Sequence, residues 1–385
     1  MKLAAGSLSF PFRKSAMLCR DLCLAQRVLG LLCLFSTAAA LALPSTMHAV
    51  RKVGLAGCGA PDFGCVSAVA DASVPAPLAG EVLLNVTGSG VNPDEITLLA
   101  LPAAHYTLGI DVAGVVVALG GSGGHGKLQL GDRVWCTGTH GGMAQFAVRP
   151  EALCAVVPPG VDMVAAGTLP TVGMTVYGAL RSAGAPWPAA GAAGAAAAGP
   201  TVVITAGTGG TGYVAVQLAK ALGAARVITA ATGAAGIALA KALGADVVVD
   251  YKRASVYSAV GAAGADVVLS NHKSNTTAAL AMGALARAGA AGGRGGVYVT
   301  LDGDVAPAGD VPAGVTQVAY DLFAPAEALR FGEYLDALAD CLVAGTLRAE
   351  VQRQFGFGDA AAALNVMAQG QVLTKLAVVP PVAAR

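Results

Sequence analysis

The sequence predicts an α/β protein of two domains, one rich in β-strands and one with a parallel sheet covered by helices. Three observations predict this class. The chain of 385 residues is long enough for two hydrophobic cores. Its first part consists of short apolar runs between turn residues. Its later part alternates apolar strands with helical segments.

The β-rich domain is expected over residues 47–170. Short Val- and Leu-rich runs are separated there by Gly, Pro and Asp, as in Glu81–Val86, Val112–Leu119 and Arg133–Cys136. Frequent short strands with turn residues between them are typical of a barrel-like sheet.

The parallel sheet is expected over residues 171–322. Five apolar runs follow one another between Thr201 and Leu301, with helical or loop segments between them. This alternation indicates a parallel sheet with both faces covered. Residues 323–385 carry a helical pattern and a last apolar strand over 376–379, and we expect them to return to the first domain.

Composition excludes two classes of partner. The net charge is +1 and no basic stripe with interleaved aromatic residues occurs, so we expect no nucleic-acid partner. The 55% hydrophobic content consists largely of alanine. Beyond the N-terminus no run of about 20 residues is free of Gly, Pro and charge, so we expect no membrane span in the mature chain.

The N-terminal residues 1–46 have the layout of a targeting leader. An apolar run over Val28–Leu43 is followed by small residues that offer a cleavage site. Five basic residues precede this run: Lys2, Arg13, Lys14, Arg20 and Arg27. The order predicts a targeting segment, and we expect an organelle, a plastid or a mitochondrion, as its destination. The alternatives are the secretory pathway, or a cytoplasmic product translated from Met47.

The eight cysteines predict no disulfide framework. Three lie in the leader, and the other five are odd in number and scattered: Cys58, Cys65, Cys136, Cys154 and Cys341. No CxxC pair occurs, so neither a zinc ribbon nor a thioredoxin-like redox site is indicated. We interpret Cys58 and Cys65 as two small buried hydrophobic residues.

The turn Ala206–Gly212 predicts a dinucleotide site. An apolar strand precedes it and a helix follows it, which is the context that such a turn requires. Gly209, Gly210 and Gly212 let the backbone approach a pyrophosphate, whose charge is favoured at the N-terminus of the helix.

The region after the second strand of this sheet favours NADP(H) over NAD(H). A site selective for NAD usually carries an acidic residue there, and Thr229–Gly233 contains none. A missing carboxylate permits a 2′-phosphate but does not bind it. Lys241, Lys252 and Arg253 are basic candidates, and Tyr251 can donate a hydrogen bond.

Beyond the glycine turn, the chain resembles a known family. Val203–Gly223 is similar to the cofactor turn of quinone oxidoreductases in the medium-chain dehydrogenase/reductase superfamily. Further segments match that family in order: Gly88–Asp94, Leu108–Gly114, Gly131–Val134, Leu169–Tyr177 and Leu243–Tyr251. The resemblance implies a GroES-like catalytic domain over 47–170, a Rossmann cofactor domain over 171–322 and a cleft between them.

The resemblance also implies a zinc-free branch of the superfamily. Zinc-dependent relatives need Cys, His and Cys or Asp at positions that are occupied here by Asn92, Ile110 and, approximately, Val172. None of these is a usual zinc ligand, so no metal site is expected.

Roles of single residues follow from the same resemblance. Asn92 and Thr175 would flank the nicotinamide, Tyr251 would contact the ribose phosphate, and Lys375 matches a Gly-Lys position of the family. Ala206 belongs to the cofactor turn, and Thr232 begins the Thr232–Gly236 run that replaces a frequent lysine. Tyr106 is a candidate proton donor; the alternative is a loop tyrosine without a catalytic role.

The resulting hypothesis is an NADPH-dependent reductase that transfers hydride to a small quinone or α,β-unsaturated carbonyl compound. Two alternatives stay open. One is a 2-enoyl thioester reductase, which would need a basic entrance for the phosphate of a carrier. The other is a catalytically idle NADPH-binding scaffold. A homodimer is also left open.

Overall fold

The computed structural model describes residues 43–102, 105–121, 126–184, 199–271, 277–290, 295–370 and 372–381. The chain divides into two units, Met1–Pro44 and Ser45–Arg385. All described helices and strands belong to the second unit. The predicted leader lies outside the described residues as far as residue 42.

The predicted parallel sheet is present and has six strands, all parallel. Its spatial order is β11 (Val247–Asp250), β10 (Arg226–Ala231), β9 (Thr201–Ile204), β12 (Val267–Ser270), β13 (Val297–Thr300) and β14 (Thr316–Ala319). Numbered along the chain, this is the order 3-2-1-4-5-6 of the Rossmann fold. The strand order reverses between β9 and β12, where a crevice for a dinucleotide is expected.

Alternation along the strands explains why both faces of this sheet are covered. Val202 and Ile204 of β9 belong to a core with α4 (Pro170–Ser182) and α5 (Gly210–Ala221). Val203 belongs to a second core with α7 (Thr277–Ala290) and the short helix η3 (Val256–Ala259). Successive side chains of a strand point to opposite faces, so an uninterrupted apolar strand needs partners on both.

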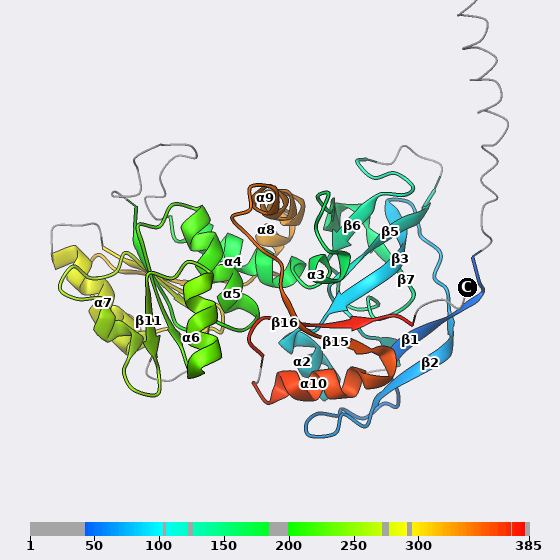
Figure 1. Ribbon diagram of the computed structural model, residues 1–385, viewed down its shortest axis with the longest axis horizontal. Coiled ribbons are helices and arrows are strands. Elements are labelled where there is room, and N and C mark those ends of the chain that lie inside the picture. Colours follow the sequence, from blue (N-terminus) through cyan, green and yellow to red (C-terminus); the bar gives the residue numbers. More distant parts are fainter. Residues whose placement is uncertain are drawn as a thin grey trace, which may run out of the picture. The chain divides into compact units, whose positions relative to one another are not determined.

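The β-rich domain holds the other two sheets. The larger one has the order β15 (Val351–Gly356), β16 (Lys375–Val379), β3 (Glu81–Gly90), β5 (Val112–Leu119), β6 (Arg133–Cys136) and β8 (Cys154–Val156), with β7 (Phe146–Pro150) also on β3. The smaller one consists of β2 (Val66–Ser73), β1 (Thr46–Lys52) and β4 (Tyr106–Thr107). Residues 351–379 therefore complete a sheet that begins at residue 81 (Figure 1).

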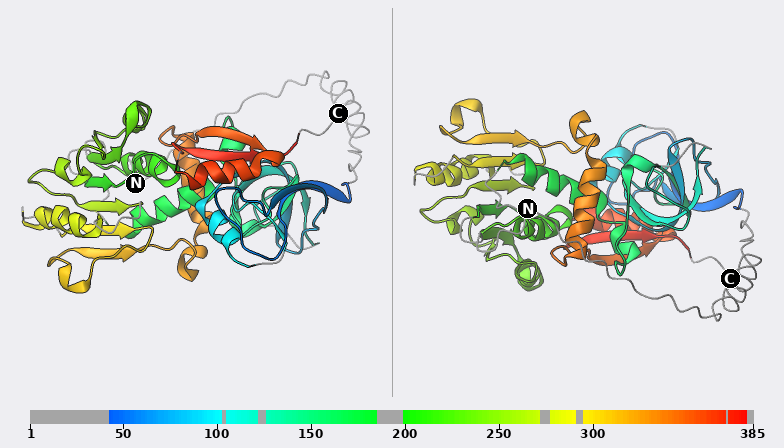
Figure 2. Two further views of the ribbon diagram at one scale, coloured as in Figure 1. Left: turned by 90° about the horizontal axis from the view of Figure 1, so that it is seen from below. Right: turned by 90° about the horizontal axis from the view of Figure 1, so that it is seen from above.

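Helices fill the space around these sheets. The remaining ones are α2 (Pro93–Ala100), α3 (Met163–Ala166), α6 (Gly233–Ala242), α8 (Pro325–Ala328), α9 (Phe331–Val343) and α10 (Ala360–Ala368), together with the short helices η1 (Glu151–Leu153), η4 (Ala308–Asp310) and η5 (Phe357–Asp359). The helical pattern expected after residue 323 begins with two separate helices, α8 and α9. Figure 2 shows α9, in orange, between the parallel sheet and the β-rich domain. A methyl group at Gly173 of α4 would lie 2.6 Å from the Leu338 side chain of α9, so glycine lets these helices pack closely.

The prediction about cysteines was wrong. Cys58 pairs with Cys65, and Cys136 on β6 pairs with Cys154 on β8. Cys136 and Cys154 are direct partners in an antiparallel ladder, a proximity that their 18-residue separation in the sequence does not reveal. Cys341 is the free thiol among the described residues.

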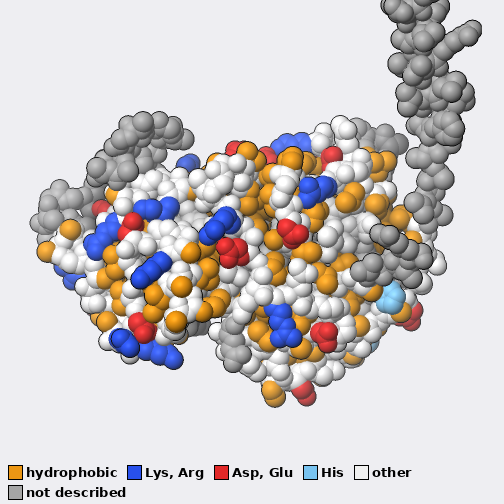
Figure 3. Space-filling view, in the orientation of Figure 1, with side chains coloured by type: hydrophobic (Ala, Val, Ile, Leu, Met, Phe, Trp, Pro, Cys, Tyr) orange, Lys and Arg blue, Asp and Glu red, His pale blue; other side chains and the backbone are white. Residues whose placement is uncertain are grey.

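The length of the helices and the distribution of surface charge also bear on possible partners. No helix among the described residues is long and apolar enough to cross a membrane. On the face shown in Figure 3, basic and acidic side chains are interspersed rather than gathered into one stripe.

Candidate cofactor pocket and the buried polar network beside it

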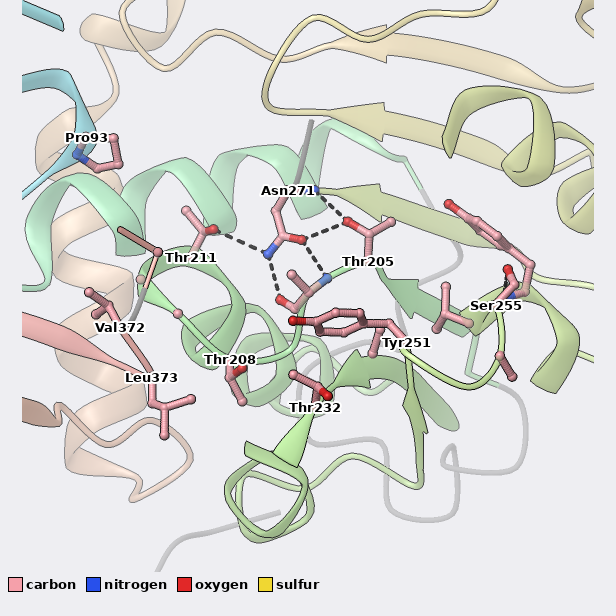
Figure 4. A pocket seen from close by; sticks show the side chains of 18 of the residues that line it. Pro93, Thr205, Thr208, Thr211, Thr232, Tyr251, Ser255, Asn271, Val372 and Leu373 are labelled. Atoms are coloured by element: carbon pink, nitrogen blue, oxygen red, sulfur yellow. Dashed lines mark hydrogen bonds between the residues drawn. The ribbon is translucent and has the colours of Figure 1, made fainter. Parts of the chain in front are cut away.

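A pocket of about 890 Å³ lies at the carboxyl ends of β9, β10 and β12 (Figure 4). The glycine turn, Tyr251, Ala254–Tyr257 and Asn271 form much of its wall. Leu280 of α7 and Pro93 of α2 also line it, and the C-terminal part of the chain contributes Met367, Gly370, Val372 and Leu373. None of the described residues that line it carries a charge. The pocket therefore lies at the reversal of strand order and is closed on one side by the C-terminal part of the chain.

The glycines of the turn have different functions. Gly209 has a φ of +97°, which residues with a side chain rarely adopt. Gly212 is buried beneath the turn, where a Cβ would lie 2.0 Å from the carbonyl oxygen of Ala206. Gly209 and Gly210 line the pocket and Gly212 does not, so Gly212 lets the helix pack against the strand.

Several N–H groups of the turn are already used inside the protein. Ala206 donates to Asn271 Oδ1 over 2.9 Å, Gly207 to the Ala230 carbonyl over 2.8 Å, and Gly209 to the Leu373 carbonyl over 3.0 Å. Helix α5 begins at Gly210, and the first N–H groups of a helix have no partner within it. The N-terminus of α5 is therefore the part of the turn that fits a diphosphate.

Asn271 holds this turn from the neighbouring strand. It directly follows β12, and its side chain contacts Thr205, Ala206 and Thr211 (Figure 4). The amide oxygen accepts from the Thr205 hydroxyl over 2.9 Å, and the amide nitrogen donates to the Ala206 carbonyl over 2.9 Å. One side chain thus joins the two strands at which the strand order reverses.

Thr232 and Tyr251 lie on the other side of the pocket, beyond β10 and β11. The Thr232 hydroxyl donates to Asp250 Oδ1 over 2.9 Å. Hydrogen bonds from Thr232 and from the Lys252 amide hold the pKa of Asp250 below its usual value. Thr229–Gly233 contains no carboxylate, but Asp250 at the end of the neighbouring strand β11 places one beside Thr232. Arg253 Nε lies 3.6 Å from the same carboxylate.

A buried polar network borders this pocket at Pro93 and Gly210, which we call the inner end of the pocket. Lys375 Nζ donates to Asn92 Oδ1 over 2.5 Å and to the Val91 carbonyl over 2.9 Å. Asn92 Nδ2 donates to Asp111 Oδ2 over 2.9 Å. Asp111 Oδ1 accepts from both the hydroxyl and the amide of Thr171, over 2.7 and 3.0 Å. The network joins four separate parts of the chain, at residues 91–92, 111, 171 and 375.

Burial shifts the pKa of each charged group in this region. It lowers the pKa of Lys375 and raises that of Asp111, and each charge opposes the shift of the other. Burial also raises the pKa of Glu95 to about 8, against hydrogen bonds from the Asn92 and Ile110 amides. Glu95 therefore carries a proton at neutral pH.

The structure brings some of the expected site residues into the pocket and leaves others beside it. Those that line the pocket are Ala206, Gly209, Gly210, Thr232 and Tyr251. Asn92 and Lys375 belong to the network. A methyl group at Gly210 would lie 3.5 Å from both Lys375 Cδ and Val172 Cγ1, so the network adjoins the turn.

Thr175 and Tyr106 are not among the lining residues. The Thr175 hydroxyl donates to the Thr171 carbonyl over 2.7 Å, one helical turn away on α4. The Tyr106 hydroxyl is buried and has no hydrogen-bond partner among the described residues. Burial raises the pKa of Tyr106, and the negative charge of Glu95 adds to the rise.

The three positions that correspond to zinc ligands in zinc-dependent relatives carry no Cys, His, Asp or Glu. Asn92 is bound to Lys375 and Asp111, and the side chains of Ile110 and Val172 are buried and apolar. Within the described ranges, no group of three or more His, Cys, Asp or Glu side chains is placed to hold a metal ion.

Sequence reasoning missed Asn271, Asp111, Glu95 and Asp250. Asn271 had a usable signal, because it follows a strand of a parallel sheet, where ligands bind. Asp111 lay inside a matched segment without an assigned role. Glu95 and Asp250 had no signal, because their importance arises from burial and from a neighbouring strand.

Two family models match the chain. That of the alcohol dehydrogenase GroES-like domain matches residues 78–159, and that of zinc-binding dehydrogenases matches residues 243–378. The chain belongs to the medium-chain dehydrogenase/reductase superfamily. Both the expected fold class and the expected superfamily are thereby confirmed.

Relatives within this superfamily include two named for quinones. The quinone oxidoreductase of Rattus norvegicus is 30% identical over 209 residues, which are 52% of this chain and 60% of that protein. The chloroplastic quinone-oxidoreductase homolog of Spinacia oleracea is 33% identical over 217 residues, 54% and 61% of the two chains. The chain thus spans about three fifths of the length of these relatives.

A solved structure extends the comparison to nearly the whole fold. A mycobacterial protein in complex with NADPH aligns with a TM-score of 0.69 at 25% identity. The alignment covers 87% of this chain and 100% of that one.

Proposed function

We propose that this protein is an NADPH-dependent reductase of quinones or α,β-unsaturated carbonyl compounds that works without zinc. The observation that carries the proposal is the pocket over the α5 N-terminus, with a preorganised Asn92–Lys375 pair beside it. The names of the relatives and the NADPH complex of a structural neighbour support the same reaction class.

The chain would bind the dinucleotide through backbone groups. The N-terminus of α5 offers N–H groups and a partial positive charge to the diphosphate. When bound, NADPH supplies the hydride that reduces the acceptor. Val372, Leu373 and Met367 form an apolar wall of the pocket, which would limit the access of water to the bound cofactor.

Asn92 would orient the nicotinamide end. Its amide oxygen is fixed by Lys375 and one amide hydrogen by Asp111, so the second amide hydrogen is held in a set direction. Such preorganisation lowers the cost of positioning a reactant. Tyr106, whose hydroxyl has no described partner, remains our candidate proton donor for the reduced acceptor.

The preference for NADPH has both support and opposition in the structure. Tyr251 lines the pocket near Thr232, and Lys252 and Arg253 follow it in the sequence. Asp250, bound to Thr232, would repel a 2′-phosphate. We propose that the hydroxyl of Thr232 shields this carboxylate enough for NADPH to bind.

An acceptor panel tests the reaction and the cofactor together. NADPH and NADH oxidation is measured in parallel with quinones, enones and 2-enoyl thioesters, with and without a chelator. We expect turnover of quinones or enones with NADPH, unchanged by the chelator. Asp250→Asn should raise the ratio of kcat/KM for NADPH to that for NADH by about tenfold, because one unit charge is removed. Lys127→Met, on the exposed surface, should not change this ratio.

Each alternative predicts a different result. Equal or faster rates with NADH contradict the cofactor assignment, and loss of activity with the chelator contradicts the zinc-free mechanism. Turnover confined to thioesters supports an enoyl thioester reductase. NADPH binding without any oxidation across the panel supports the idle scaffold.

We also propose that residues 1–46 direct the protein to an organelle. The chloroplastic name of the spinach relative supports this destination. Fluorescent fusions of the whole chain and of a chain starting at Met47 test it. Import of the first and a cytoplasmic location of the second are expected, and identical locations would contradict the proposal.

A further inference from the structure

Arg149 of β7 is a buried cation that the proposed reaction does not yet use. Its side chain is 3% exposed, and its hydrogen bonds go to backbone carbonyl oxygens. These are Val148 at 3.0 Å and Gly109 and Ile110 at 3.1 Å each. Nε has no partner among the described residues. Burial of a guanidinium is costly, so this arrangement needs a reason beyond packing.

The loop between β6 and β7 is shaped around this guanidinium. A Cβ at Gly138 would lie 2.8 Å from Arg149 Nε, and one at Gly142 would lie 3.0 Å from its terminal nitrogen. The Gly142 amide donates to the Gly109 carbonyl over 2.7 Å, which is the same oxygen that Arg149 binds. The arginine therefore holds the loop and the turn at Gly109 against each other.

The turn held by Arg149 carries the central carboxylate of the buried network. Gly109 and Ile110 directly precede Asp111, whose carboxylate binds Asn92 on one side and Thr171 on the other. Gly109 has a φ of +105°, so the turn is held in a conformation that glycine allows. Burial lowers the pKa of Arg149 to about 10, and Asp111 opposes this shift, so the arginine is charged at neutral pH.

We propose that Arg149 is a positioning residue: by fixing the turn before Asp111, it sets the direction in which Asn92 faces the inner end of the cofactor pocket. This inference rests on the proposed function, because it gives Asn92 its place beside the nicotinamide. Arg149 acts through Asp111 and touches neither the cofactor nor the acceptor.

Two substitutions separate the charge of Arg149 from its shape. Arg149→Met removes both, and Arg149→Lys keeps the charge but cannot bind three carbonyl oxygens with a planar fork. Arg133→Met is a matched control, because Arg133 on β6 also donates to a backbone carbonyl, that of Val161. NADPH affinity is measured by equilibrium binding, and kcat with the best acceptor of the panel.

We expect Arg149→Met to lower kcat ten- to hundredfold, on the order of what a misplaced catalytic group costs, with the Kd for NADPH changed by less than about threefold. Arg149→Lys should recover part of the loss, and Arg133→Met should leave kcat unchanged. An unchanged kcat in Arg149→Met overturns the proposal. A loss that only follows the fraction of unfolded protein also overturns it.

Hydrogen exchange provides a readout that does not depend on turnover. The Gly142 and Thr171 amides donate to the Gly109 carbonyl and to Asp111, so both should exchange faster in Arg149→Met than in the wild type and in Arg133→Met. If the wild type oxidises no NADPH, the proposed function fails, and the exchange of Thr171 still decides whether Arg149 positions Asp111. Unchanged exchange at Thr171 overturns the positioning.

Discussion

At the scale of single residues, burial decides the chemistry more than residue type does. Glu95 stands in the first turn of α2, where an acidic residue ordinarily faces water and favours the helix dipole. Here it is 2% exposed and accepts from the Asn92 and Ile110 amides. The sequence shows the acid, but its burial depends on strands that are remote along the chain.

The raised pKa of Glu95 predicts a pH dependence of stability. The unfolded chain releases this proton near pH 4.5, and the folded protein retains it until about pH 8. Between these values the folded state binds more protons than the unfolded state. The free energy of unfolding therefore falls as pH rises. A pKa shift of this size corresponds to a fall on the order of a few kcal/mol.

Glu95→Gln should remove this fall, as measured by denaturant unfolding at several pH values between 5 and 8. Glu333→Gln is the control, because Glu333 is exposed and Arg330 lowers its pKa. Identical pH profiles for the wild type and Glu95→Gln would show that Glu95 is ionised in the folded protein.

At the scale of elements, the strand–turn–helix unit around the cofactor turn is the part that local sequence describes best. The apolar strand expected before the turn is β9, and the helix expected after it is α5. The bonds that hold the turn come from elsewhere, namely from Asn271 after β12 and from Leu373 before β16. A local pattern contains neither contact.

The packing of α5 against β9 gives a prediction about Gly212. Because a Cβ there would lie 2.0 Å from the Ala206 carbonyl, Gly212→Ala should destabilise the protein by about 2–4 kcal/mol and weaken NADPH binding. Gly283→Ala on α7 is the matched control, since a Cβ there meets nothing within 4 Å. It should stabilise the protein by about 0.5–1 kcal/mol. Thermal unfolding measures both, and a neutral Gly212→Ala would contradict the close packing.

At the scale of the whole molecule, Lys375 connects the last strand of the fold to the start of α2. Its buried Nζ binds Val91 and Asn92, 284 and 283 residues away in the sequence, and its charge faces that of Asp111. The resemblance pointed to Lys375 as a family position, but only the fold shows that it closes the network beside the cofactor turn.

Removal of Lys375 tests this connection. Lys375→Met removes a buried cation that opposes the rise in the pKa of Asp111, so we expect a loss of about 3–5 kcal/mol of stability by urea denaturation. Lys127→Met is the control. Lys127 forms an ion pair with Asp336 of α9, but the two side chains are 81% and 57% exposed, and such pairs contribute about 0–1 kcal/mol. Equal effects of the two substitutions would contradict a structural role for the buried charge.

The sequence by itself determined the fold class, five of the six strands of the parallel sheet, and the place of the glycine turn. These features depend on local periodicity and on residues close together in the chain. The tertiary structure decided which groups meet: Cys136 with Cys154, Thr232 with Asp250, and Lys375 with Asn92. Such pairs depend on strand order and register, and the shifted pKa values depend on burial. Both arise only when segments far apart in the sequence pack together.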